Sequence, residues 1–366
     1  MKKLVSFVAA AFAVLACSSP KEAFPVYMSF RPGEDLEEVS ENFRFMKEKG
    51  VTGVCVHLTS RADDLAFMEE VASRAHAEGL EYHALVLCNL RDGLPHEWYT
   101  VNRLGQSSDE FPPYTPRYKF IDPHNPEVRS YLVRELGKIA DVPSVDYIEL
   151  DFIRYPDVIL PKGYESIFNR VVDGEEPIAD CCYCDACTSD FKEKTGIDIL
   201  AVEDPSTCLE WAQFRCDAVT GLVNELAAAL HAKGKKVSAA VFPGPASFAI
   251  PAERQDWGKW DVDLFFAMNY NALHCQSVGW IKDVTVEELE ASGGKPVVSL
   301  LFVCKDWQER DKAATAMRSG LTPAELSEAV KDAMEVKASG VGVYTYSRMA
   351  PEHWEALQSA LKRQEK

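Results

Sequence analysis

Eight short apolar runs alternate with helical patterns along the chain, and this alternation limits the possible folds more than any other feature. The runs are continuous in Val, Ile, Leu and Phe, as in parallel strands that are buried on both faces. The predicted strands are 24–30, 51–58, 80–89, 145–152, 236–242, 262–270, 296–303 and 340–346. The predicted helices are 35–49, 63–78, 126–140, 189–195, 209–233, 323–338 and 351–361.

This order predicts an α/β protein made of a single (β/α)8 TIM barrel over residues 23–366. A chain of 366 residues also has room for two smaller domains, but no repeat or linker divides it. An open doubly wound sheet is the alternative fold, and no glycine-rich phosphate loop follows any predicted strand. Long loops are expected after strands 3 and 4, and loops of this length are usually functional.

The first residues resemble an export signal rather than part of the fold. Met1 to Lys3 are basic at two of three positions, 4–15 are apolar, and Ala16 precedes Cys17. An apolar stretch of this length is too short to span a bilayer. The pattern resembles a bacterial lipoprotein cleavage site, with a signal peptide at 1–16, a lipid anchor on Cys17 and a tether at 17–22. This predicts export to the cell envelope, at the outer membrane or cell surface. An ordinary secretory signal is the alternative.

The chain has a formal net charge of −18, which limits the ligands that its surface can attract. Nucleic acids and anionic polymers are repelled by an acidic surface, so we expect neither as a ligand. A neutral or basic ligand fits this charge.

The fourth apolar run, VDYIELDFIRYP at 145–156, combines a buried strand with carboxyl groups. Side chains alternate along a strand, so Tyr147, Glu149 and Asp151 share one face, with Phe152 on the other. Burying carboxylates is costly unless they are paired or protonated. This predicts either a catalytic site or a structural ion pair.

Asp151 is the predicted catalytic carboxyl group, with Glu149 as its partner or as a residue that orients it. Asp306 and Asp92, which follow other predicted strands, are alternatives for the second carboxylate of a glycosidase. Arg154 would either bind substrate or keep Asp151 ionised.

Barrel enzymes place their chemistry at the C-terminal ends of the strands. Aromatic, amide and charged side chains gather at these predicted ends, as expected of a carbohydrate site. The predicted substrate-binding residues are His57, Asn89, Arg154, Asn269, Tyr270, Asp306 and Tyr346. Core packing is the alternative role for each aromatic or histidine side chain.

Several segments resemble the family ten glycosylhydrolase-like barrels. The typical fourth-strand motif of that group, D-G-I-H-x-D-Y-x-R-Y-P, is similar to VDYIELDFIRYP. Further segments resemble that group at DPHNPEVRSYLVREL (122–136), FRCDAVTGLVNELAAALHAKGKKVSAAVFP (214–243), WDVDLFFAMNYN (260–271) and GVGVYTY (340–346). The resemblance implies a barrel acting on glycans, with Asp151 at the position of the motif's strand-four Asp.

A more distant resemblance is to chitinase barrels, whose fourth strand reads D-x-x-D-x-D-x-E and whose sixth carries M-x-Y. Asp146, Glu149 and Asp151 occupy the first three acidic places, and 268–270 reads Met-Asn-Tyr. Ile153 stands where the catalytic Glu would be. Substrate-assisted hydrolysis of the chitinase type is therefore not expected.

A cysteine cluster lies in the predicted loop after strand 4. The spacing of Cys182, Cys184 and Cys187 lets three thiolates bind one tetrahedral zinc ion. A similar C-x-C-x-x-C occurs after the fourth strand in a family of β-galactosidases that bind structural zinc. The candidates for a fourth ligand are Cys181, Cys208, Cys88 and Asp180. Disulfides or free thiols are the alternatives, and a role in anchoring the loop is expected in each case.

The sequence therefore predicts an exported lipoprotein glycoside hydrolase that needs no cofactor for catalysis. A catalytically inert barrel that binds glycans is the alternative. A hydrolase acting on another class of substrate is disfavoured, because the predicted strands carry no recognisable set of metal-binding histidines.

Overall fold

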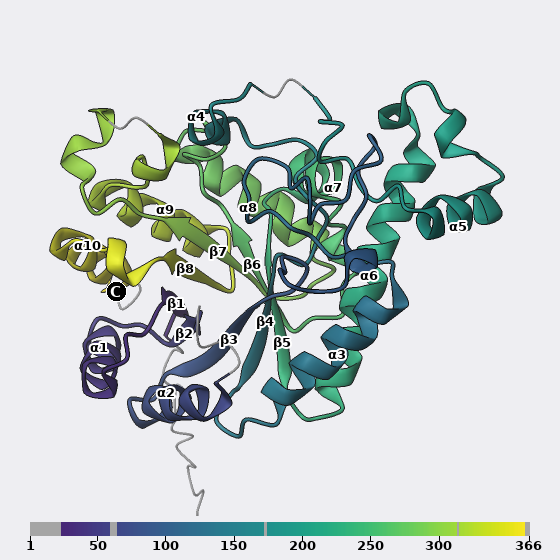
Figure 1. The fold of residues 1–366 in the computed structure, drawn as a ribbon. Helices are drawn as coiled ribbons and strands as arrows, with labels where there is room; N and C mark the ends of the chain where they lie inside the picture. Colours follow the sequence, from purple (N-terminus) through teal and green to yellow (C-terminus); the bar gives the residue numbers. More distant parts are fainter. Residues whose placement is uncertain (1–22, 59–63, 172–173, 313–314, 363–366) are drawn as a thin grey trace, which may run out of the picture.

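The computed structural model describes residues 23–58, 64–171, 174–312 and 315–362, which form a closed barrel of eight parallel strands (Figure 1). The predicted signal peptide, Cys17 and the tether lie outside the described residues. In the described part of the chain, no helix combines the length and the apolar character needed to cross a membrane.

The strands follow one another around the barrel in chain order. Their bounds are β1 (Val26–Phe30), β2 (Gly53–Val56), β3 (Glu81–Leu87), β4 (Tyr147–Asp151), β5 (Lys236–Val241), β6 (Leu264–Met268), β7 (Val297–Phe302) and β8 (Gly340–Tyr344). The barrel closes where β1 pairs with β8, with Tyr27 opposite Gly342. The prediction of a single eight-stranded (β/α)8 barrel is confirmed.

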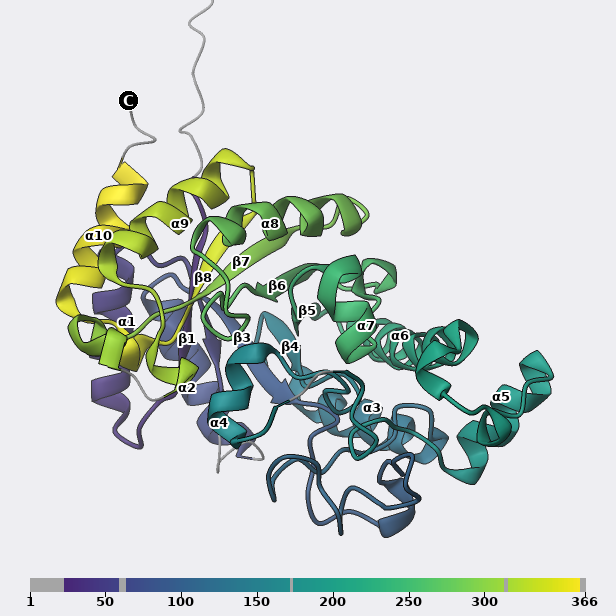
Figure 2. The same cartoon turned by 90° about the horizontal axis from the view of Figure 1, so that it is seen from above.

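Helices cover the outside of the barrel (Figure 1, Figure 2). The main ones are α1 (Leu36–Glu48), α2 (Leu65–Ala77), α3 (Pro126–Ala140), α5 (Asp185–Thr195), α6 (Leu209–His231), α8 (Gly279–Ala291), α9 (Pro323–Glu335) and α10 (Pro351–Leu361). Two single-turn helices are α4 (Glu165–Phe168) and α7 (Ile250–Glu253). Only α8 among the main helices has no counterpart in the sequence prediction. Its buried face includes the polar residues Thr285 and Glu288, which weakens the amphipathic pattern.

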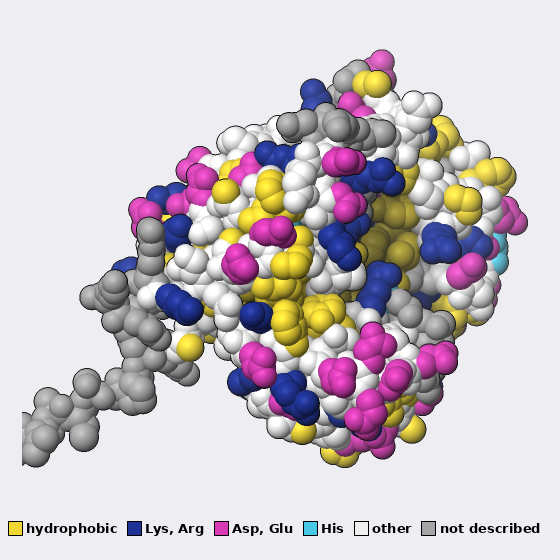
Figure 3. All heavy atoms as spheres, turned by 90° about the vertical axis from the view of Figure 1, so that its left-hand side faces the viewer, with side chains coloured by type: hydrophobic (Ala, Val, Ile, Leu, Met, Phe, Trp, Pro, Cys, Tyr) yellow, Lys and Arg dark blue, Asp and Glu magenta, His cyan; other side chains and the backbone are white. Residues whose placement is uncertain are grey.

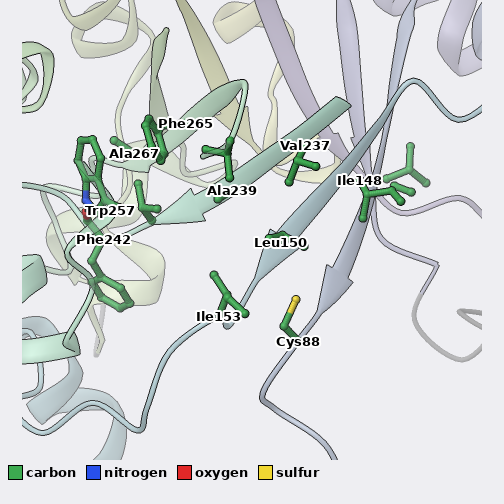
Figure 4. Packing of buried hydrophobic residues seen from close by; sticks show 14 of the residues in the cluster. Cys88, Ile148, Leu150, Ile153, Val237, Ala239, Phe242, Trp257, Phe265 and Ala267 are labelled. Carbon is green, nitrogen blue, oxygen red and sulfur yellow. Dashed lines mark hydrogen bonds between the residues drawn. The ribbon is translucent and has the colours of Figure 1, made fainter. Parts of the chain in front are cut away.

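Strand β4 presents two different faces. Ile148 and Leu150 point outward and pack with Val237 and Ala239 of β5, in the layer between barrel and helices (Figure 4). Tyr147 belongs to a smaller cluster inside the barrel. Glu149 and Asp151 share the inward face with Tyr147, which is the alternation that the sequence predicts.

Two long connections cover the C-terminal end of the barrel, as predicted: 88–125 between β3 and α3, and 152–208 between β4 and α6. They are joined by backbone hydrogen bonds. The Tyr183 N–H donates to the Val101 carbonyl at 2.7 Å, and the Arg103 N–H donates to the Asp180 carbonyl at 3.0 Å. These contacts give the two loops a common structure above the strand ends.

Candidate functional site

A pocket opens at the C-terminal end of the barrel, and both carboxyl groups of β4 line it. The cavity has a volume of about 180 Å³, and its lining is mostly aromatic and aliphatic. All eight strands contribute residues, among them Ser29, Cys55, Leu85, Ala240 and Leu300. Figure 3 shows a hollow on the surface, floored by hydrophobic side chains and edged by Lys and Arg.

Glu149 lies one layer deeper than Asp151 and is 2 % exposed. Burial raises the pKa of Glu149 to about 8, and the hydrogen bond from the Cys55 thiol offsets this only in part. Its Oε2 atom is buried without a hydrogen-bond partner. Glu149 therefore carries a proton at neutral pH, and its carboxyl group is neutral.

Asp151 stands at the end of β4 and is partly exposed. Burial raises the pKa of Asp151 to about 6, against opposing effects from the Phe152 N–H, Arg154 and Arg31. The Phe152 N–H donates to Oδ1 at 2.8 Å. Asp151 is thus mainly ionised at pH 7 and can take up a proton in mildly acidic conditions.

The backbone turns sharply just after Asp151. Phe152 has a φ of 51°, a left-handed conformation that side chains other than glycine rarely adopt. Its ring lines the pocket instead of continuing the outward face, so the predicted orientation of Phe152 is wrong. Ile153 then points outward into the core beside Leu150 (Figure 4). The position of the chitinase glutamate is therefore both aliphatic and turned away from the pocket.

Tyrosine and phenylalanine rings form the wall opposite β4. Tyr270 lies 5.5 Å from Phe302 and 5.8 Å from Tyr344, measured between ring centroids. The pKa of Tyr270 is raised by burial and by nearby Tyr344 and Asp151, so its hydroxyl stays protonated. Such a wall offers stacking faces to a sugar ring and a hydroxyl donor near Asp151.

The loop after β4 adds Tyr164 to this wall. It can approach the loop after β6 closely because residue 163 is glycine. The Gly163 N–H donates to the Leu273 carbonyl at 2.8 Å, and a Cβ at position 163 would lie 2.6 Å from that oxygen. Any larger residue here would push Tyr164 away from the pocket.

Arg154 borders the pocket, but its guanidinium is committed to other groups. It is 3 % exposed, donates to Asp157 at 2.9 Å and lies 3.1 Å from a Glu253 carboxylate oxygen. The rings of Phe120, Phe152 and Phe242 surround it at 4.9–5.3 Å. Arg154 thus weakly favours ionised Asp151, as the sequence suggested, while its ion pairs lie elsewhere.

Two of the predicted binding residues point into the core outside the pocket. Asn89 is fully buried and donates to the Ile121 carbonyl at 3.1 Å. Asn269 is also buried, and its amide donates to Ser299 at 2.9 Å and Glu288 at 3.1 Å. These amides satisfy polar groups between strands and helices, because alternation turns them away from the barrel interior.

The remaining predicted binding residues also lie away from the pocket. His57 lines a separate groove between α2 and α3, where burial and Arg31 lower its pKa to about 4. The Tyr346 hydroxyl donates to Asn42 at 2.7 Å. Asp306 is exposed and does not line the pocket, and Asp92 is bound to Lys119 at 2.9 Å. Among the described residues, Asp151 and Glu149 are the only carboxyl groups that line the pocket.

The cysteine cluster lies behind the pocket, between the two long loops. The thiols of Cys182, Cys184 and Cys187 converge, but the fourth group is Asp122, which the sequence interpretation missed. All four candidate ligand atoms lie within 4.8 Å of one another. All ten described cysteines are free, so the disulfides considered from the sequence are not formed in this part of the chain.

The four residues that the sequence offered as a possible fourth metal ligand interact with other groups instead. Asp180 is paired with Arg215 and accepts from the Tyr183 hydroxyl at 2.7 Å. The Cys88 thiol is within 3.5 Å of the Val86 carbonyl. Cys181 faces Thr100, and Cys208 lies near Glu210. The sequence contained one indication that Asp122 matters: this residue begins the segment 122–136, which resembles the family ten group.

No known protein-family profile matches the chain, and no curated protein matches it in sequence. Solved structures do match its fold. A β-galactosidase from Bacillus circulans sp. alkalophilus superposes with a TM-score of 0.61 at 13 % identity, over 93 % of this chain and 55 % of that one. A class V chitinase from Pseudomonas fluorescens Pf-5 gives 0.55 at 14 % identity, over 93 % and 100 %. The spore cortex-lytic enzyme SleL from Bacillus megaterium QM B1551 gives 0.51 at 10 %, over 93 % and 75 %.

The chain has a TIM-barrel fold that resembles these glycoside hydrolases. At 10–14 % identity the likeness concerns the fold alone. The chain spans about half of the β-galactosidase and the whole of the chitinase.

Proposed function

We propose that this protein is a glycoside hydrolase of the family ten glycosylhydrolase-like type and that Asp151 is its principal catalytic carboxylate. The observation that carries the proposal is a carboxyl pair with no ion-pair partner among the described residues, placed in an aromatic pocket at the C-terminal end of the barrel. Perturbed carboxyl groups in such a cleft are typical of acid/base sites.

The two carboxyl groups differ in protonation, which suits different roles. With its pKa near 6, Asp151 is ionised at pH 7 and can act as a base or nucleophile toward the sugar. With its pKa near 8, Glu149 is neutral beneath it and keeps the pair at a single negative charge. Their Cα atoms are about 6.6 Å apart, as expected for positions i and i+2 of a strand.

The size of the cavity indicates how much substrate is enclosed. At about 180 Å³ it is smaller than the ~300–1,000 Å³ of pockets for drug-sized ligands. We infer that the enclosed part receives one sugar ring, stacked on the wall of Tyr270 and Tyr344, while the rest of the glycan lies outside.

A barrel that binds glycans without cleaving them is the second candidate. It is favoured by one observation: both pocket carboxyl groups come from the same strand. Glycosidases of most families place their two carboxyl groups on either side of the scissile bond.

Turnover of a panel of neutral oligosaccharides by the wild-type protein, Asp151→Asn and Asp306→Asn decides between the two. Hydrolysis by wild type and Asp306→Asn, with a loss of at least about 10³-fold in Asp151→Asn, supports the enzyme. Glycan binding without turnover in all three supports the binding protein. Full turnover by Asp151→Asn contradicts the catalytic assignment.

We also propose that the enzyme is a lipoprotein of the cell envelope, because Ala16-Cys17 follows a basic and apolar stretch. Membrane-associated protein in wild type, and its release in Cys17→Ser, would support the anchor. Equal membrane retention of both would contradict it.

A further inference from the structure

The cluster of Asp122, Cys182, Cys184 and Cys187 has the chemistry and spacing of a tetrahedral metal site. Zinc bonds of about 2.3 Å to sulfur and about 2.0–2.2 Å to oxygen place tetrahedral ligand atoms roughly 3.5–3.8 Å apart. Asp122 Oδ2 lies 3.2 Å from the Cys187 sulfur and 3.6 Å from the Cys184 sulfur. Small shifts would bring all four atoms to bonding distance from one ion.

Asp122 is held so that a single oxygen faces the thiols. Its Oδ1 accepts the His124 N–H at 2.9 Å and the Tyr155 hydroxyl at 3.4 Å. Its Oδ2 is directed at the sulfur atoms, and the residue is 3 % exposed. Metal-binding carboxylates are oriented in this manner by hydrogen bonds to the oxygen that does not coordinate.

The backbone around the cysteines favours negatively charged sulfur. The Val101 N–H is 3.4 Å from the Cys182 sulfur, and the Cys187 N–H is 3.4 Å from the Cys184 sulfur. Cys184 is also the N-cap of α5, where the partial positive charge of the helix start stabilises a thiolate. Thiolates, not thiols, bind zinc.

We propose that Asp122, Cys182, Cys184 and Cys187 bind one Zn²⁺ ion that fastens the loop after β3 to the loop after β4. On binding, the thiols release their protons to solvent, and the three sulfurs and Oδ2 fill the coordination sphere. Protein side chains fill all four coordination positions, as in structural zinc sites and unlike catalytic ones.

Tyr155 connects the metal site to the pocket by contacts on both sides. This residue donates to Asp122 and directly follows Arg154, whose guanidinium donates to the Tyr155 carbonyl at 3.0 Å. Arg154 in turn packs on Phe152 in the pocket wall. Tyr155 is therefore a positioning residue between the metal site and the wall.

Metal content and thiol titration of protein purified without chelator test the site directly, without an assay of turnover. We expect about one zinc per chain in wild type and in Cys208→Ser, which changes a cysteine of the same loop outside the cluster. Asp122→Ala and Cys184→Ser should each lower zinc affinity by more than about 100-fold. Asp122→Cys restores a fourth ligand and should bind zinc again, even if Asp122→Ala folds poorly.

Two results would overturn the site. One is wild-type protein that binds no zinc after reduction and reloading, or that carries a disulfide among these three cysteines before reduction. The other is Asp122→Ala with wild-type zinc affinity. For the connection to the pocket, Tyr155→Phe should weaken zinc binding about 10-fold and speed proteolysis of 88–125 in the zinc-loaded protein. If Tyr155→Phe changed neither the zinc affinity nor the rate of proteolysis, Tyr155 would not position the site.

Discussion

Two pairs of carboxyl groups lie beside the same pocket, and only one of the pairs has a cation as its partner. Asp157 and Glu253 share the guanidinium of Arg154, at 2.9 and 3.1 Å. Glu149 and Asp151 have no ion pair with a cation within the described residues. The first pair is completely buried, whereas the second faces the cavity.

The difference separates a structural role from a chemical one. Burial and Asp157 raise the pKa of the Glu253 carboxyl group well above its usual value, and Arg154 offsets this only in part, so the two carboxyl groups share one cation and hold segments together. Arg215 and Asp180 show the same arrangement between α6 and the loop after β4. Glu149 and Asp151 face the cavity without such a cation, and burial is the largest cause that raises their pKa values, to about 8 and about 6. Their protons can therefore be exchanged near neutral pH, which is what acid/base chemistry requires.

The largest expected effect on stability follows from removing the shared cation. Arg154→Met should lower the free energy of unfolding by about 3–5 kcal/mol, because it leaves the Asp157–Glu253 pair buried without the cation that the two residues share. Urea denaturation measures this. The triple variant with Asp157→Asn and Glu253→Gln should recover most of the loss, since no buried charge remains. If Arg154→Met were as stable as wild type, the Asp157–Glu253 pair would not depend on its cation, and the two pairs would not differ in role.

An effect of similar size, spread over several pH units, is expected from the carboxyl pair in the pocket. The pKa of Glu149 is about 8 in the folded protein and 4.5 in a model peptide, so the folded state binds more protons between these values. The free energy of unfolding should therefore fall as pH rises from 5 to 8, by up to about 1.4 kcal/mol per unit.

Glu149→Gln has no proton to lose and should abolish this decline, gaining stability relative to wild type as pH rises. Denaturation curves at pH 5, 6.5 and 8 measure the difference. Asp151→Asn is the matched control, and its gain should be complete at lower pH because the pKa of Asp151 is about 6. If the free energy of unfolding of wild type changed with pH in the same way as that of Glu149→Gln, Glu149 would not be a neutral acid in the folded protein.

The barrel could be predicted because its signals are local and repeated. Each strand is an apolar run, and helices such as α3 and α9 begin at recognisable caps, Asn125 and Thr322. The inward direction of Glu149 and Asp151 followed from alternation alone.

The composition of the site could not be read in the same way. Phe152 enters the pocket through a left-handed backbone turn, which no pattern of residue types signals here. Asn269 and Asn89 stand at strand ends, but an error of one position exchanges inside for outside. Asp122 lies 60 residues before Cys182 in the chain, so only the folded loops bring them together.

The smallest expected effect concerns Asp306, which the sequence offered as one alternative for the second carboxylate that works with Asp151. Asp306 is exposed after β7 and lies outside the pocket lining, so its charge is solvated and needs no partner. Asp306→Asn should change the free energy of unfolding by less than about 0.5 kcal/mol and leave any turnover unchanged. Paired denaturation and turnover measurements with Asp151→Asn give the comparison. A large loss of turnover in Asp306→Asn would mean that substrate draws the loop after β7 into the site, and the pocket would then have its carboxylate from a second strand.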